Sequence, residues 1–100
     1  MITLCRSMSV SPGMFSAAMA FATETSAQVK ATTGVDVKIA LPIGGDVGRI
    51  GWIANYENLA QYEAAGLKLL GDQKYQEIIK KAAGIFVPNT SMMRFGERSN

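Results

Sequence analysis

The first ten residues alternate between apolar and polar side chains, which is the pattern of a β-strand with one buried face. The predicted strand runs from Ile2 to Val10. Its apolar row is interrupted once, by Arg6. Because an unpaired guanidinium is costly to bury, Arg6 must form an ion pair, remain exposed or line a polar pocket.

A helical pattern follows. Ser11, Pro12 and Gly13 end the strand, and we expect Ser11 to be the N-cap of a helix with Pro12 at its first position. From Phe15 onward, apolar and small residues recur at helical spacing, and Gly34 predicts the end of the helix.

Two further strands form a predicted hairpin. The segments 35–43 and 49–56 both alternate, and the loop GGDVG joins them. A phosphate-binding loop is the alternative interpretation of the glycines, but a strand follows them instead of a helix, and no Lys-Ser or Lys-Thr pair is present. In the strand over residues 49–56, Trp52 and Tyr56 share one face and Asn55 lies on the other.

The second helical region is predicted to consist of two pieces. Asn58 is the expected N-cap of the first, with Gln61 as its capping-box partner. Gly71 interrupts this helix, and Asp72 begins a second one. The buried stripe of the first piece is expected to contain Leu59, Tyr62, Ala65, Leu69 and Gly66, and that of the second Tyr75, Ile78, Ile79, Ala82 and Phe86. A last strand is expected over residues 90–97, with Met93 and Phe95 on one face and Met92 and Arg94 on the other.

The order of elements is β-α-β-β-α-β, which predicts one α+β domain over residues 1–100 with a ferredoxin-like, four-stranded antiparallel sheet and a broken second helix. Right-handed crossovers place the helices on one face of such a sheet and leave the other face open. Apolar residues make up 48% of the chain. This fraction favours burial of the open face against a second copy, so we expect a homodimer.

The segment from Trp52 to Phe86 carries a recognisable sequence, W-x-x-x-Y-E-N-L-A-Q-Y-E followed by L-x-L-L-G-D-Q-K-Y-Q-E-I-I. It resembles the dimeric α+β-barrel superfamily, and within it the NIPSNAP-like and antibiotic-biosynthesis-monooxygenase-like families. The resemblance implies two sheets that meet by their open faces to form a barrel, and a substrate pocket between sheet and helices. Cofactor-independent oxygenases of these families use Asn, Trp and Arg, and haem-degrading members add a histidine.

This chain contains Asn55 and Trp52, and either Arg6 or Arg94 could be the arginine of such a group, but the spacing of these residues does not match those families' motifs. The resemblance therefore implies a fold and a dimer, and it transfers no catalytic residue. The chain has no histidine at all, which removes imidazole bases, Ser-His and Cys-His pairs, histidine haem ligation and the usual zinc ligand sets. We expect no metal and no cofactor.

Composition narrows the partners further. The ten Lys and Arg residues are scattered apart from Lys80 and Lys81, so no stripe suited to nucleic acid exists. No segment approaches the roughly 20 apolar residues of a membrane span. The single cysteine, Cys5, cannot form an intramolecular disulfide, which suits a cytoplasmic protein. A signal-peptide interpretation of MFSAAMAFATETSA is disfavoured because Pro12 and Gly13 break the run and its removal would delete a strand and a helix.

Four residues are candidates for ligand binding. Arg6 either pairs with Asp36 or Glu97 or holds an anionic or carbonyl oxygen in a pocket. Trp52 and Tyr56 either pack in the core or dimer interface, or wall an aromatic pocket with Tyr62 or Tyr75. Arg94 is the fourth, with a solvated strand-end position as its alternative.

The expected function is binding of a small, partly apolar molecule between sheet and helices by a homodimer. Two alternatives stay open at this point. One is a cofactor-independent monooxygenase or isomerase, and the other is a non-catalytic dimerisation or assembly module.

Overall fold

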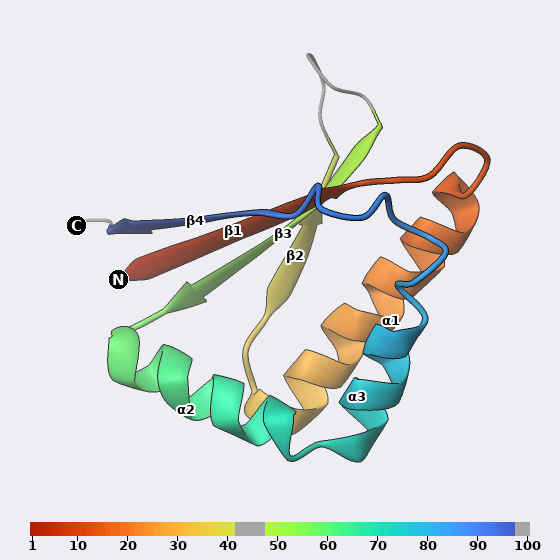
Figure 1. Cartoon of the computed structure of the whole chain (residues 1–100). Coiled ribbons are helices and arrows are strands. Elements are labelled where there is room, and N and C mark those ends of the chain that lie inside the picture. The colour runs from red at the N-terminus through yellow and green to blue at the C-terminus, as the bar shows by residue number, and fades with distance from the viewer. Residues whose placement is uncertain (42–47, 98–100) are drawn as a thin grey trace.

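The protein is described from a computed structural model, which covers residues 1–41 and 48–97. It has an α+β fold, with a four-stranded antiparallel sheet on one side and three helices on the other (Figure 1). The elements are β1 (Ile2–Ser9), α1 (Phe15–Thr33), β2 (Val37–Ala40), β3 (Arg49–Tyr56), α2 (Leu59–Leu70), α3 (Gln73–Lys80) and β4 (Met92–Glu97).

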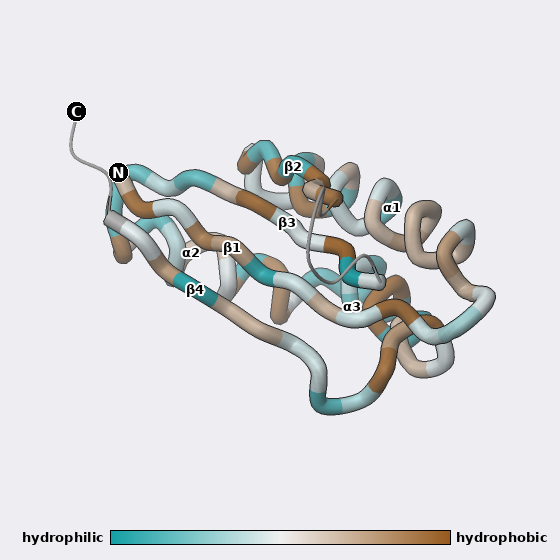
Figure 2. The backbone as a smooth tube through the Cα atoms, turned by 90° about the horizontal axis from the view of Figure 1, so that it is seen from above, coloured by the Kyte–Doolittle hydropathy of each residue, from teal (hydrophilic) through white to brown (hydrophobic). Residues whose placement is uncertain are grey.

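The strand order is β2-β3-β1-β4, so β1 and β3 are central and β4 is an edge strand. Figure 2 looks onto the sheet with the helices behind it. Arg6 is paired with Trp52 of β3 on one side and with Met93 of β4 on the other. Because cross-strand partners point to the same face, Arg6, Trp52 and Met93 all face the helices.

The four predicted strands are present, the predicted hairpin of β2 and β3 is confirmed, and β3 has the predicted bounds. β1 ends one residue early, and Val10 instead forms an isolated bridge with Phe86. β2 and β4 are shorter than predicted, since β2 covers only 37–40 and β4 begins at Met92. Residues 42–47, which include most of the predicted GGDVG loop, lie outside the described part of the chain.

The predicted start of α1 is wrong. The helix begins at Phe15 after Met14, and Ser11 provides no cap. Gly13 has φ of 78°, and the Met14 N–H donates to the Ser11 carbonyl at 3.0 Å. Proline followed by a left-handed glycine is the sequence of a type II turn, which prevents Pro12 from opening a helix.

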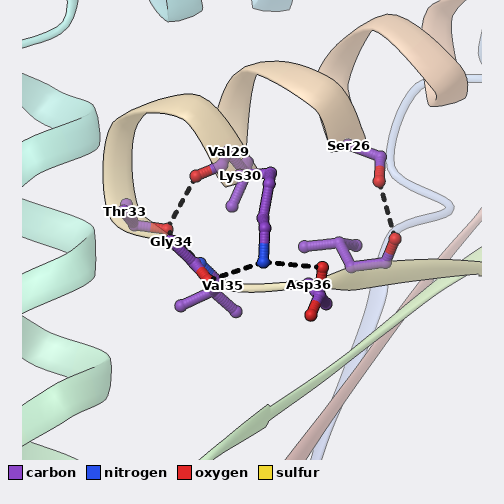
Figure 3. Close-up of polar contacts among 8 residues, drawn as sticks. Ser26, Val29, Lys30, Thr33, Gly34, Val35 and Asp36 are labelled. Carbon is purple, nitrogen blue, oxygen red and sulfur yellow. Dashed lines mark hydrogen bonds and ion pairs between the residues drawn. The ribbon is translucent and has the colours of Figure 1, made fainter.

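Figure 3 shows how the end of α1 is fastened to β2. Gly34, with φ of 78°, ends the helix as predicted, and its N–H donates to the Lys30 carbonyl. The Lys30 ammonium forms an ion pair with Asp36 at 3.0 Å, and the Ser26 hydroxyl donates to the Val37 carbonyl at 2.6 Å. These contacts fix the chain reversal that places β2 beside α1.

The break between α2 and α3 is confirmed. Asn58 accepts a hydrogen bond from the Gln61 N–H at 2.9 Å, and the Gln61 side chain accepts one from the Glu57 N–H, one residue earlier than in a standard capping box. Asp72 caps α3 by accepting from the Lys74 N–H at 3.1 Å. Leu59 was expected in the buried stripe, but it is 57% exposed because it lies in the first turn of α2, beyond the sheet.

The core consists of two clusters. The first joins α1, β3, α3 and the segment after it, and contains Ala18, Phe21, Ala22, Ile50, Trp52, Ile78 and Phe86. The second joins the end of α1, β3 and α2, and contains Val29, Val35, Ala54, Tyr56 and Ala65. The helices pack on the sheet mainly through β2 and β3. The helix-facing side of β1 and β4 is therefore less covered.

Candidate ligand-binding site

A cavity of about 590 Å³ lies between the sheet and the helices. Its walls include members of both core clusters, so it lies where the two clusters meet. The cavity is in the size range of pockets for small ligands. Arg6, Leu70 and Met93 line it and are also exposed, so it opens to solvent between β4 and α2.

Most of the cavity wall is apolar. The sheet contributes Leu4, Met8, Val37, Trp52, Ala54 and Met93, and the helices contribute Phe21, Val29, Leu69, Leu70, Ile79 and the nearby Ala82. Polar atoms come from Arg6, three tyrosines, Thr25 and Gln76. The Thr25 hydroxyl is used within α1, where it donates to the Phe21 carbonyl at 2.8 Å. An apolar wall with a few polar groups is typical of a site for a small amphipathic molecule.

Among the described residues that line the cavity, Arg6 is the only charged one. The sequence left open an ion pair with Asp36 or Glu97. Asp36 instead pairs with Lys30 in the last turn of α1, and the Glu97 side chain lies outside the described part. Among the side chains that the structure describes, none forms an ion pair or hydrogen bond with Arg6. Arg6 is exposed, so its guanidinium is solvated at the edge of the cavity.

Three tyrosines gather on the helix-facing side of the sheet. Tyr56 lies on β3, Tyr62 on α2 and Tyr75 on α3, and all three line the cavity. The Tyr56 and Tyr62 rings meet edge to face with centroids 5.3 Å apart. Burial raises the pKa of the Tyr56 hydroxyl above its usual value, and the nearby Tyr62 and Tyr75 raise it further. All three hydroxyls lack a hydrogen-bond partner among the described residues.

Tyr75 connects this group to Arg6. Burial raises the pKa of Tyr75, and the positive charge of Arg6 partly offsets that rise. Tyr75 and Arg6 both line the same cavity. Because the pKa values of Tyr56 and Tyr75 are raised, these phenols are protonated at neutral pH and act as hydrogen-bond donors.

Trp52 belongs to both the core and the cavity. Its indole packs against Phe21 and Phe86, with ring centroids 6.2 and 5.8 Å away. The side chain is 9% exposed, and its buried indole N–H has no hydrogen-bond partner among the described residues. Trp52 and Tyr56 share one face of β3, as their parity predicted, and the structure places that face on the side of the helices, where Tyr62 and Tyr75 also line the cavity.

Arg94 does not join the other three candidates. It is paired with Cys5 and points away from the helices, on the face that we call the outer face of the sheet. Asn55 lies on the same face, as its parity predicted, and its side-chain oxygen accepts from the Thr3 hydroxyl at 2.7 Å. An Asn-Trp-Arg group of Asn55, Trp52 and Arg6 is therefore divided between two faces of the sheet.

Arg49 forms a polar cluster that the sequence did not indicate. Its guanidinium donates to the Ser9 hydroxyl at 2.9 Å, to the Ser7 hydroxyl at 3.0 Å and to the Thr90 carbonyl at 2.6 Å. These bonds tie the start of β3 to β1 and to the segment before β4. The cluster lies on the outer face and holds the edge strand in register, so it is distinct from the cavity.

Within residues 1–41 and 48–97, no group of three or more Cys, Asp and Glu side chains is arranged to hold a metal ion. Of the helices in this part of the chain, none is long and apolar enough to cross a membrane.

Comparison with known proteins identifies the fold. The chain is similar to an uncharacterized NIPSNAP domain protein from Burkholderia xenovorans, with a TM-score of 0.84 and 10% identity over 99% of this chain and 95% of that one. A NIPSNAP family protein from Agrobacterium tumefaciens gives a TM-score of 0.83 and 16% identity, over 99% and 86% of the two chains. An antibiotic biosynthesis monooxygenase gives 0.75 and 7% identity over the whole of both chains.

No family model matches the sequence, and no curated protein is significantly similar to it. The similarity lies in three-dimensional structure, and at these identities it defines the fold alone. The chain therefore has the ferredoxin-like α+β fold shared by NIPSNAP domain proteins and an antibiotic biosynthesis monooxygenase.

Proposed function

We propose that this protein binds a small, partly apolar molecule in the cavity between the sheet and the helices. The observation that carries the proposal is the cavity itself, about 590 Å³ with a largely apolar wall and a few unpartnered polar groups. Apolar surface that stays open to water is unfavourable, and a ligand would bury it. Met93 and Leu70, at the opening of the cavity, are 47% and 72% exposed, so a bound ligand would also remove part of their apolar surface from water.

The test is a thermal-shift screen of small aromatic and aliphatic compounds against the whole chain. Binding to the folded state raises Tm by an amount that grows with the ratio of free ligand concentration to Kd. Quenching of the fluorescence of Trp52, the single tryptophan, locates a hit at the cavity. Arg6→Ala should weaken such hits while Tm without ligand stays within a few degrees, because Arg6 is exposed and unpaired among the described side chains. A screen in which no compound raises Tm would contradict the proposal.

A cofactor-independent monooxygenase or isomerase is the second candidate. The observation that favours it is the pair of donors, Arg6 and Tyr75, at one cavity. Such donors can stabilise an oxygen anion that develops on a bound substrate. The described lining contains no carboxylate, lysine or histidine, so proton removal would depend on a tyrosine or on the acidity of the substrate. Oxygen consumption, or exchange of substrate hydrogen for deuterium, tests this candidate once a ligand is known.

We also propose that two copies associate through their outer faces. Ile53 and Met92 contribute apolar surface to this face, and Met92 is 50% exposed. Within the described strands, the outward positions carry Lys38, Arg49 and Arg94 and no acidic residue. Because two such faces repel one another, the dimer should strengthen as salt screens the charges.

Light scattering at micromolar concentration from low to high salt measures this association. Ile53→Asp on the outer face should shift the equilibrium towards monomer. Leu67→Asp is the matched control, because Leu67 is 71% exposed on α2, on the opposite side of the molecule. A monomer at every salt concentration would contradict the dimer proposal and would leave the cavity proposal intact.

A further inference from the structure

The cavity has an unbalanced charge. Of the residues that line it, Arg6 alone is charged, and the described lining contains no Asp, Glu or Lys. The ion pairs found among the described residues, Lys30 with Asp36 and Lys81 with Glu24, lie elsewhere. A guanidinium beside apolar walls gains most from a partner that brings a negative charge, since charge-assisted hydrogen bonds are about twice as strong as neutral ones.

The groups around Arg6 are also donors. Arg6, Tyr56, Tyr62 and Tyr75 all line this one cavity, and the Tyr56 and Tyr62 rings are in contact, with centroids 5.3 Å apart. The amide nitrogen of Gln76 is already used, because it donates to the Leu69 carbonyl at 3.1 Å. The Arg6 guanidinium and the hydroxyls of Tyr56 and Tyr75 donate to no acceptor among the described residues, which indicates that the ligand supplies the acceptor.

The rest of the wall limits the ligand's body. Phe21, Val29, Leu69 and Ile79 face the same space, and they come from three different helices. They provide no polar atom for a sugar or a second anionic group. A diphosphate or dicarboxylate would bring more negative charge than the single guanidinium can offset.

We infer that the ligand of this cavity is a monoanion with an apolar, aromatic or aliphatic body, whose anionic oxygen binds at Arg6 and Tyr75. The inference rests on the proposed function and adds the chemical class. It covers monocarboxylates, enolates and phenolates. The apolar body occupies the space between Trp52 and Tyr56, which lie four residues apart on the same face of β3.

The experiment compares three probes that share one body, namely 4-phenylbutyrate, 4-phenylbutanol and 4-phenylbutylammonium. Binding to the whole chain is measured at pH 7 by thermal shift and by Trp52 fluorescence. We expect the acid to bind about tenfold more tightly than the alcohol, and the ammonium ion to bind most weakly. Arg6→Met should remove the preference for the acid and leave the affinity for the alcohol unchanged, since it keeps an apolar stem of similar length.

Two further variants isolate the cause. Arg94→Met removes a guanidinium from the outer face, and it should keep the full preference for the acid. Tyr75→Phe keeps the ring and removes the hydroxyl, and it should weaken the acid roughly fivefold while the alcohol is less affected. Circular dichroism of each variant verifies that it is folded.

The outcomes separate the two ideas. If the alcohol or the ammonium ion binds as tightly as the acid, or if Arg6→Met keeps the preference, the inferred ligand class is wrong and the cavity remains a binding site. If no probe binds and the broader screen also finds no ligand, the proposed function fails, and the inference fails with it.

Discussion

Gly66 offers a way to close the cavity without disturbing the core. It lies in α2 on the same stripe as Tyr62, Leu69 and Leu70, and all four residues line the cavity. A Cβ placed at Gly66 meets no atom within 4 Å. Replacement by a larger residue therefore causes no clash at the backbone, and the new side chain extends over the cavity.

Two variants at this position separate stability from binding. Gly66→Ala should stabilise the protein by about 1 kcal/mol, because glycine is a poor helix former in a helix interior. For a domain of this size that corresponds to a rise in Tm of about 4–8 °C. Gly66→Phe should also be folded, with a Tm at or above that of the wild type, since phenylalanine is a better helix former than glycine.

Binding should respond differently in the two variants. The methyl group of Gly66→Ala leaves the cavity open, so the affinity for 4-phenylbutyrate should change less than twofold. The ring of Gly66→Phe occupies the space that the ligand needs, so the affinity should fall at least tenfold, or about 1.4 kcal/mol. Thermal melts without ligand and fluorescence titrations of Trp52 measure both effects. A folded Gly66→Phe variant with wild-type affinity would refute the assignment of the cavity as the binding site.

Three other predictions concern stability. Trp52→Phe should destabilise the protein by about 1–3 kcal/mol in urea unfolding, because it leaves a void beside Phe21 and Phe86. The indole N–H makes no hydrogen bond within the described part, so no hydrogen bond is lost. An unchanged unfolding midpoint would contradict this packing role. Arg49→Lys should cost about 1–3 kcal/mol, since an ammonium cannot reach both serines and the Thr90 carbonyl together, and a neutral result would mean that the cluster is dispensable. Hydrogen bonds from Thr32 and Gln28 lower the pKa of Asp72 below its unfolded-state value. The unfolded chain therefore binds the proton more readily than the folded one. The stability that the Asp72 carboxylate contributes above about pH 4 is lost as the pH falls further. Asp72→Asn should therefore be less stable than wild type at pH 7, with a smaller difference at pH 3, and a difference independent of pH would refute this linkage.

Some features of the fold followed from short-range sequence signals. β3 carries apolar residues at every second position from Ile50 to Tyr56, so its bounds and the faces of Trp52 and Asn55 could be predicted from parity. The caps at Asn58 and Asp72 were also predictable, because capping depends on residues within three positions along the chain. The start of α1 was missed since Ser-Pro is compatible with both a helix cap and a turn, and only the left-handed Gly13 decides between them.

The site was only half predictable. Arg6 could be singled out from sequence because a charge in an apolar row is unusual. That Arg6 and Arg94 lie on opposite faces of the sheet could not be predicted, because the relative register of β1 and β4 is set by pairing between residues far apart in the chain. In the structure, Arg94 is opposite Cys5 and Met93 is opposite Arg6. Sequence parity gives two faces for each strand, and packing of the helices decides which face is inside.

The cavity itself belongs to the tertiary structure. Tyr56, Tyr62 and Tyr75 lie on three separate elements, and they converge because α2 and α3 change direction at the Gly71-Asp72 break. The sequence by itself determined the elements, their order and the α+β class, since these depend on periodicity and local capping. The tertiary structure decided that Arg6 and the three tyrosines line one cavity, because the relative placement of distant elements depends on long-range packing that no local pattern encodes.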